Sequence, residues 1–194
     1  MKRAPVVPYE EYKEVQIRRA GIKWGSRTFW NNITYFNETV REALELAGGY
    51  PDSICCMGIR NGNDYTGFKE KPEFRNCVVY GVDIHPDVEK VGSNCFCYDF
   101  AKLPKDWEKK FDWVYSNSID HAYDVKETLK EWWRVCKGYI LLTMSNETEV
   151  DQADVYSFLV DDEQTLFDKE LFKVIKVWKI RGAETTFNVL LKII

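Results

Sequence analysis

The sequence lacks the long hydrophobic runs that membrane insertion and secretion require. No stretch approaches about 18 uninterrupted apolar residues, and the N-terminus, MKRAPVVPYEEYKE, becomes charged too early for the apolar segment of a signal peptide. We therefore expect a cytoplasmic protein that does not enter a membrane. In that compartment the three Asn-x-Thr tripeptides are chance matches rather than glycosylation sites; they lie at Asn32, Asn37 and Asn146.

Cysteine pairs of the kind found in zinc and thiol redox sites are also absent. Six cysteines are present, but no two of them have the Cys-x-x-Cys spacing. Most lie in apolar runs, so we interpret them as reduced, buried hydrophobic residues. A metal site formed by Cys95, Cys97 and one of the two histidines is the weaker alternative, and we expect no metal.

Internal repeats, low-complexity tracts and a Pro/Gly/Ser-rich linker are missing as well. The 194 residues, 45% of them apolar and 15% aromatic, supply one hydrophobic core of ordinary size. We expect a single domain over residues 1–194, with an N-terminal helical cap at 1–49 and a larger core at 50–194.

The chain lacks a net positive charge, but its N-terminus is basic. The chain has a net charge of −4, yet residues 1–30 carry seven Lys and Arg against three Glu. We interpret this basic segment first as a solvated helix face, although it would also suit an anionic small molecule. Contact with nucleic acid is disfavoured, because the whole chain lacks the strongly basic character of proteins that bind it.

Hydrophobic periodicity and turn residues predict a chain in which helices and strands alternate. Helices are expected at 9–20 and at 36–47, the second capped by Asn37 and ended by the Gly-Gly pair that follows it. Further on, strand patterns alternate with helix patterns, which predicts a parallel sheet with right-handed crossovers. Seven strands are expected, at 53–57, 77–82, 94–97, 111–116, 138–144, 171–179 and 186–193.

Three connecting segments complete the predicted fold. Residues 125–136 form an amphipathic helix pattern that begins after Asp124 and ends before Gly138. The link between the last two strands is too short for a crossover helix, so these strands should form an antiparallel hairpin. The acidic stretch 147–170 is expected to form a helix or a lid over the sheet edge. The fold class is thus α/β, a doubly wound three-layer sandwich with a mostly parallel seven-stranded sheet.

Two strand-end patterns indicate a site for an adenosine-bearing ligand. In residues 53–63 an apolar run ends in a glycine-containing turn, and in residues 77–85 the next apolar run ends in Asp83. Glycines let a ligand approach the backbone, and a carboxylate at the second strand end can accept both ribose hydroxyls. The alternatives are an ordinary strand-to-helix turn and a plain β-turn aspartate.

Four motifs follow one another along the chain. They are ICCMGIRNGND at 54–64, VVYGVDIHP at 78–86, CFCYDFAKLP at 95–104 and FDWVYSNSIDHAYD at 111–124. In this order they resemble the motifs of the class I S-adenosylmethionine-dependent methyltransferases, specifically the small stand-alone enzymes that act on small molecules, sugars or lipids. The fourth motif is similar to the family's Phe-Asp-x-(Val/Ile)-x-Ser-Asn-Ser-(Leu/Ile)-(Asp/Glu)-His stretch after the fourth strand. The resemblance covers residues 50–194.

The resemblance implies S-adenosyl-L-methionine as the cofactor and methyl transfer as the activity. It places the methionine part of the cofactor on the first glycine loop, the ribose on Asp83, and the adenine amino group on Asp99. For Asp99, capping of the following turn is the alternative. The implied cofactor-binding residues are Gly58, Arg60, Asn61, Gly62, Asp83, Ile84, Asp99, Phe100, Ser116, Asn117 and Ser118.

The resemblance also indicates where the acceptor binds. His121 is the candidate general base or acceptor-orienting group, since imidazole titrates near neutral pH, and Asp120 would face the acceptor too. Capping of the next helix is the alternative for His121. The N-terminal segment is expected to close over a small acceptor that is anionic or sugar-like, because guanidinium groups and aromatic faces suit both. Its candidate residues are Tyr12, Arg18, Arg19, Trp24, Arg27 and Trp30.

Two residues of the first loop depart from the family pattern. Cys56 stands where an acidic residue is usual, and Arg60 occupies the middle glycine position. A Gly-x-Arg-x-Gly-Asn-acidic form occurs among methyltransferases of this type, so we interpret the loop as a subtype.

Three other functions compete with methyl transfer to a small molecule. A non-catalytic binding protein with the same fold is supported by the altered first loop. A nicotinamide-dependent oxidoreductase would need a Gly-x-Gly-x-x-Gly loop and a Tyr-x-x-x-Lys pair, which are absent. A nucleic-acid amino-methyltransferase would carry (Asp/Asn/Ser)-Pro-Pro-(Tyr/Phe) after the fourth strand, where this chain has Ser-Asn-Ser-Ile.

Overall fold

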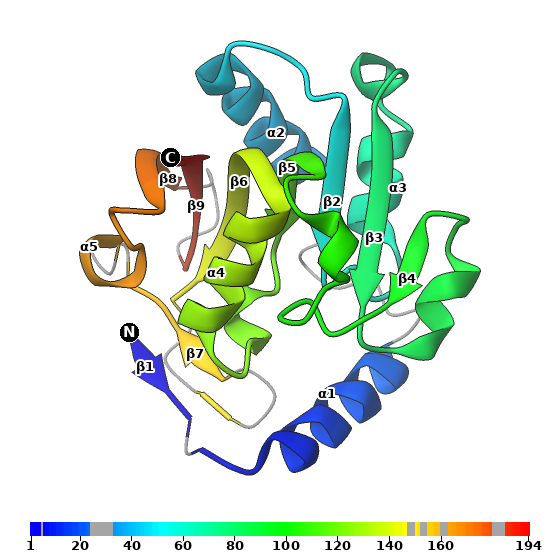
Figure 1. Ribbon diagram of the computed structural model, residues 1–194, viewed down its shortest axis with the longest axis vertical. Helices are drawn as coiled ribbons and strands as arrows, with labels where there is room; N and C mark the ends of the chain where they lie inside the picture. The colour runs from blue at the N-terminus through cyan, green and yellow to red at the C-terminus, as the bar shows by residue number, and fades with distance from the viewer. Residues whose placement is uncertain (5, 24–32, 147–149, 152–154, 160–162, 180–184) are drawn as a thin grey trace.

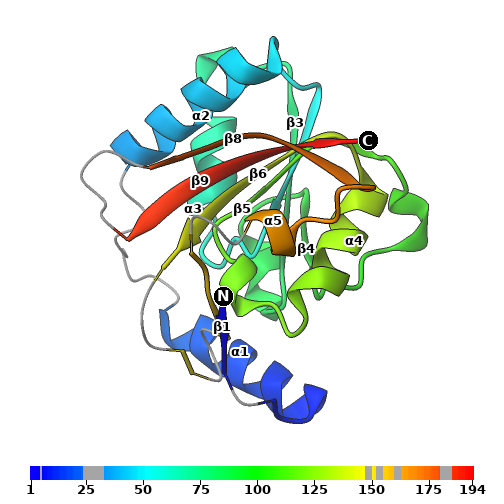
Figure 2. The ribbon, with the colours of Figure 1, turned by 90° about the vertical axis from the view of Figure 1, so that its left-hand side faces the viewer.

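The structure is a three-layer α/β sandwich, a central sheet with helices on both faces (Figures 1 and 2). It is a computed structural model that describes the chain apart from residue 5 and the segments 24–32, 147–149, 152–154, 160–162 and 180–184. The fold class predicted from the sequence is confirmed.

The central sheet has seven strands in the order β4-β3-β2-β5-β6-β9-β8. Neighbours from β4 to β6 are parallel, whereas β9 runs antiparallel to both β6 and β8. The predicted C-terminal hairpin is therefore present. The strands are β2 (Ser53–Met57), β3 (Val78–Asp83), β4 (Cys95–Cys97), β5 (Phe111–Ser116), β6 (Cys136–Ser145), β8 (Phe172–Lys179) and β9 (Thr186–Ile193).

Helices cover the two faces of the sheet unequally. One face carries α2 (Ile33–Ala47) and α3 (Asn63–Lys69), and the other carries α4 (Val125–Val135). A further helix, α1 (Tyr9–Lys23), crosses the carboxyl ends of the parallel strands (Figure 1). Short 3-10 turns lie at Pro72–Phe74, Pro86–Lys90, Lys105–Trp107 and Ile119–His121. No helix in the described part of the chain is long and apolar enough to cross a membrane.

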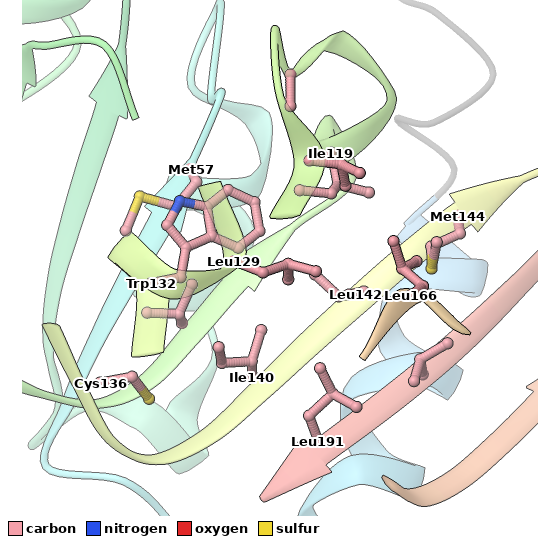
Figure 3. Packing of buried hydrophobic residues seen from close by; sticks show 14 of the residues in the cluster. Met57, Ile119, Leu129, Trp132, Cys136, Ile140, Leu142, Met144, Leu166 and Leu191 are labelled. Atoms are coloured by element: carbon pink, nitrogen blue, oxygen red, sulfur yellow. The ribbon is translucent and has the colours of Figure 1, made fainter. Parts of the chain in front are cut away.

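Strand periodicity explains why both faces of the sheet are buried. Successive side chains of a strand point to opposite faces, so in β2 Ile54 packs toward α2 and α3 while Cys55 and Met57 pack toward α4. Figure 3 shows the α4 side, where the fully buried Trp132 and Leu129 meet strand residues of β2 and β6. A strand buried on both faces reads as a continuous apolar run, which is the pattern that the sequence shows.

Helix α4 begins where the sequence predicts. The Asp124 side chain accepts hydrogen bonds from the backbone N–H groups of Lys126 and Glu127, at 3.0 and 3.2 Å. Such a cap stabilises a helix by about 1 kcal/mol. The helix ends at Val135 and β6 follows at once, so this strand is longer than predicted at both ends.

Two predictions about other helices are wrong. Helix α2 begins at Ile33, so Asn37 is an exposed residue inside it and not its cap. The earlier start buries Phe36 against the rings of Phe68 and Tyr115, and this packing outweighs the capping preference of Asn37. Helix α1 continues past the predicted end at residue 20, through Gly21 to Lys23.

The acidic stretch 147–170 is not one helix in its described parts. It contains β7 (Tyr156–Ser157) and the short helix α5 (Glu163–Leu166). Strand β7 pairs antiparallel with β1 (Lys2–Arg3), which the sequence did not predict. This small ladder fixes the N-terminus beside the carboxyl ends of the parallel strands, next to α1 (Figure 2).

Candidate functional site

A pocket opens at the carboxyl ends of β2, β3 and β5, beneath helix α1. This is the edge of an α/β sheet at which ligands bind. Every sheet-side residue of the pocket was predicted as a site residue. The pocket is lined by Tyr12, Gln16, Arg19 and Ala20 of α1 and by Gly58, Arg60, Asp83, Ile84, Asp99, Phe100, Ser118 and His121.

The loop after β2 turns back sharply on itself. Gly58 has φ of 75° and donates its N–H to the carbonyl of Val82 at 2.8 Å. Gly62 has φ of 83° and closes the turn with a hydrogen bond to the Ile59 carbonyl. Positive φ is the region that glycine adopts at little cost. Arg60 also has positive φ, at 48°, so the middle position is held in a conformation that glycine would adopt more easily.

Asp83 ties this loop to the end of β3. One carboxylate oxygen accepts the Arg60 N–H at 2.7 Å and the other accepts the His85 N–H at 2.9 Å. The side chain is only 5% exposed, and this burial raises its pKa, against the opposing effect of the two N–H donors. These two hydrogen bonds to backbone N–H groups thus fix the orientation of the carboxylate at the pocket.

Asp99 has two partners, one expected and one not. Its Oδ1 accepts the Ala101 N–H at 2.8 Å, so it does cap the turn that follows. Its Oδ2 accepts a hydrogen bond from the Tyr9 hydroxyl of α1. Next to it, Phe100 packs edge-on against Trp132, whose indole N–H donates to the Phe100 carbonyl at 2.9 Å. This wall of the pocket is therefore rigidly held.

The residues after β5 connect the pocket to the glycine loop. Ser116 is fully buried and donates to the Met57 carbonyl at 3.0 Å, and its oxygen accepts the N–H of Ser118. The Ser118 hydroxyl contacts the Gly58 carbonyl at 3.2 Å and the side-chain oxygen of Asn117 at 2.9 Å. Only Ser118 of these three lines the pocket.

Six predicted site residues within the described part of the chain do not reach the pocket surface. Ser116 and Asn117 lie behind Ser118 and hold it, as described above. Gly62 faces Val91 at the back of the loop. The six residues are Arg18, Asn61, Gly62, Ser116, Asn117 and Asp120.

His121 lies at the pocket, in the 3-10 turn that follows β5. Its backbone carbonyl accepts a hydrogen bond from the Tyr12 hydroxyl. The alternative role, capping the next helix, is wrong, because Asp124 supplies that cap. His121 therefore lines the pocket and does not cap α4.

Two pocket residues of α1, Gln16 and Ala20, were not predicted from the sequence. Tyr12, Gln16 and Ala20 repeat every four residues, so they share one buried face of the helix and close the pocket from above. The spacing of Tyr12 and Gln16 in the sequence indicates a shared helix face, but it gives no signal that Gln16 and Ala20 line a pocket. Arg19 lines the pocket and pairs with Asp151 at 3.6 Å. Trp24, Arg27 and Trp30, also predicted to close over the acceptor, lie outside the described residues.

The described residues hold no group of three or more His, Cys, Asp or Glu side chains placed to bind a metal ion. All six cysteines are free thiols, including Cys95 and Cys97.

The fold is similar to that of known proteins, although the sequence is not. No protein-family model and no curated protein matches the sequence. The structure is similar to Burkholderia thailandensis 1,6-didemethyltoxoflavin-N1-methyltransferase, solved with 1,6-didemethyltoxoflavin and S-adenosylhomocysteine (TM-score 0.75, 14% identity, 98% of this chain and 92% of that chain covered). It is also similar to Synechocystis PCC 6803 magnesium protoporphyrin IX methyltransferase with bound S-adenosylhomocysteine (TM-score 0.69, 12% identity, 95% of this chain and 99% of that chain covered). A third similar structure is a SAM-dependent methyltransferase from Aquifex aeolicus (TM-score 0.61, 15% identity, 95% of this chain and 98% of that chain covered).

Proposed function

We propose that this chain, which has the fold of the class I S-adenosylmethionine-dependent methyltransferases, is itself such an enzyme and methylates a small-molecule acceptor. One observation carries the proposal. The glycine loop, Asp83 and Asp99 converge on one pocket at the carboxyl edge of the sheet. Those are the groups that an adenosine-bearing cofactor needs, and several neighbours of the same fold were solved with S-adenosylhomocysteine.

The geometry of the pocket supports a role for each of these groups in binding the cofactor. Asp83 is oriented to accept the ribose hydroxyls, Ile84 lies where it can contact the adenine, and Asp99 can accept the adenine amino group. The loop from Gly58 to Gly62 would receive the methionine part through its backbone amides. The buried Ser116 and the partly buried Asn117 would act on the site through Ser118.

The reaction needs few catalytic side chains. Bound S-adenosylmethionine would supply an already activated methyl group. The protein has to orient the acceptor, exclude water and remove a proton where the acceptor atom carries one. Helix α1 covers the pocket, and His121 is the pocket base that can take the proton. We place the enzyme in the cytoplasm, where six free thiols stay reduced.

Cofactor binding is the first test of this function. Titration calorimetry with S-adenosylhomocysteine should show saturable binding to the full chain. Absence of binding at millimolar concentration would overturn the proposal, and binding of a nicotinamide cofactor instead would favour an oxidoreductase. If the cofactor binds but a metabolite library with labelled S-adenosylmethionine yields no methylated product, the chain is a non-catalytic binding protein.

Arg19 is the proposed contact for an anionic acceptor. It lines the pocket, whereas its neighbour Arg18 is exposed on the outer side of α1. With the acceptor found in the screen, Arg19→Ala should raise the acceptor KM about tenfold, the usual effect of losing one charge-assisted contact. Arg18→Ala is the matched control and should leave KM unchanged. Equal acceptor KM values in the two variants would show that Arg19 does not contact the acceptor.

A further inference from the structure

Asp64 is a buried carboxylate that the proposed cofactor site does not yet explain. It lies in the first turn of α3, directly behind the glycine loop, and is only 9% exposed. Its carboxylate accepts a hydrogen bond from the Asn117 side chain and lies close to the charge of Arg60. A buried carboxylate is costly unless it is paired, so the presence of Asp64 at this position needs a reason.

The buried side chains of β2 and β5 next to Asp64 are neutral. Cys56 of β2 is fully buried, and both burial and the nearby Asp64 raise the pKa of its thiol. The thiol therefore stays neutral. Tyr115 of β5 is buried beside Asp64 as well, and its pKa is raised in the same way. Asp64 is thus the ionisable group of this set that can carry a negative charge, in addition to Asp83 at the end of β3, and Arg60 is the cation close to both.

A short chain of hydrogen bonds leads from Asp64 to the pocket. Asn117 donates to Asp64 with its amide nitrogen, and its amide oxygen accepts the Ser118 hydroxyl at 2.9 Å. The Ser118 hydroxyl also contacts the carbonyl of Gly58, at 3.2 Å. The ionised carboxylate fixes which way the Asn117 amide faces. That orientation in turn sets the position of Ser118 against the glycine loop.

We propose that Asp64 is a positioning residue that supplies the negative charge at the end of β2 and, through Asn117 and Ser118, shapes the glycine loop for the amino-acid end of the cofactor. This inference rests on the proposed function. It assigns Asp64 to one part of the ligand only, because the loop faces the methionine part while Asp83 and Asp99 serve the nucleoside.

The ionisation of Asp64 should make binding depend on pH. Burial raises its pKa to about 7, against the attraction of Arg60 and the Asn117 hydrogen bond. The unfolded carboxyl titrates near about 4, so the folded state favours the neutral form, and stability falls as pH rises from about 4 to 7. At pH 8 the charge of Asp64 therefore lowers the stability of the fold. The same charge should strengthen binding of the cofactor.

Two ligands that differ only in the amino-acid end test this inference. Binding of S-adenosylhomocysteine and of 5′-methylthioadenosine is measured by calorimetry at pH 6 and pH 8. Asp64→Asn should weaken S-adenosylhomocysteine roughly tenfold at pH 8, the usual effect of losing a charge-assisted hydrogen bond, and less at pH 6. It should leave 5′-methylthioadenosine binding unchanged and should not lower the melting temperature at pH 8.

Controls separate this role from a structural one. Asp112→Asn changes a half-buried carboxylate at the opposite end of β5 and should alter neither affinity. Asn117→Ala interrupts the chain of hydrogen bonds while Asp64 stays in place. Its loss of S-adenosylhomocysteine affinity should not add to the loss caused by Asp64→Asn in the double variant. Equal weakening of both ligands, or no weakening of either, would overturn the inference. Failure of the unaltered protein to bind either ligand would instead overturn the proposed function.

Discussion

Replacing Asp83 with asparagine should weaken S-adenosylhomocysteine binding by about 100-fold, because hydrogen bonds to a charged group contribute about 1.5–3 kcal/mol each. The N–H groups of Arg60 and His85 bind different oxygens of Asp83, and an asparagine side chain has an oxygen at only one of these two positions. The NH₂ group would face one of these donors, and it would offer the ribose hydroxyls a weaker acceptor. The loop after β2 and the nucleoside site are thus affected together.

Calorimetry with S-adenosylhomocysteine and with adenosine measures this prediction. Both ligands should lose affinity, since the carboxylate acts on the ribose that they share. Asp87→Asn is the control: Asp87 is close in sequence but lies away from the pocket and pairs with Lys90. An Asp83→Asn variant that kept its affinity within threefold would show that the ribose binds elsewhere.

Gly58→Ala should abolish measurable cofactor binding and lower the free energy of unfolding by about 1–3 kcal/mol. The residue has φ of 75°, a conformation that alanine rarely adopts. A Cβ atom there would lie 2.6 Å from Ser118 Cβ and 2.9 Å from Ser118 Oγ. The new methyl group would therefore push Ser118 and the loop apart, and it would also intrude on the pocket that Gly58 lines.

Two further variants separate strain from collision at Gly58. Gly49→Ala is the control, because a Cβ there meets nothing within 4 Å and its φ is not positive, so both affinity and stability should stay unchanged. Adding Ser118→Gly to Gly58→Ala removes the collision but keeps the strain, so it should restore part of the stability. Chemical unfolding and calorimetry provide the two readouts. Unchanged binding in Gly58→Ala alone would place the cofactor away from this loop.

The amino-acid sequence determined the layered fold, because the forces that form its elements act over a few residues. The apolar run of β2 specified a strand buried on both faces, and Asp124 specified the start of α4. The position of Asp83 at a strand end placed it at the carboxyl edge of the sheet. Where local signals competed, as at Asn37, packing of Phe36 decided the outcome and the local prediction failed.

The tertiary structure alone decided how the site is closed. Tyr9 reaches Asp99 across 90 residues of sequence, and Gln16 becomes a pocket residue only because α1 crosses the strand ends. Asp64 looks like an ordinary polar residue in the first turn of a helix, yet its burial beside Cys56 and Asn117 raises its pKa to about 7. Such contacts and burial depend on how separate elements pack, which periodicity and spacing along the chain do not encode.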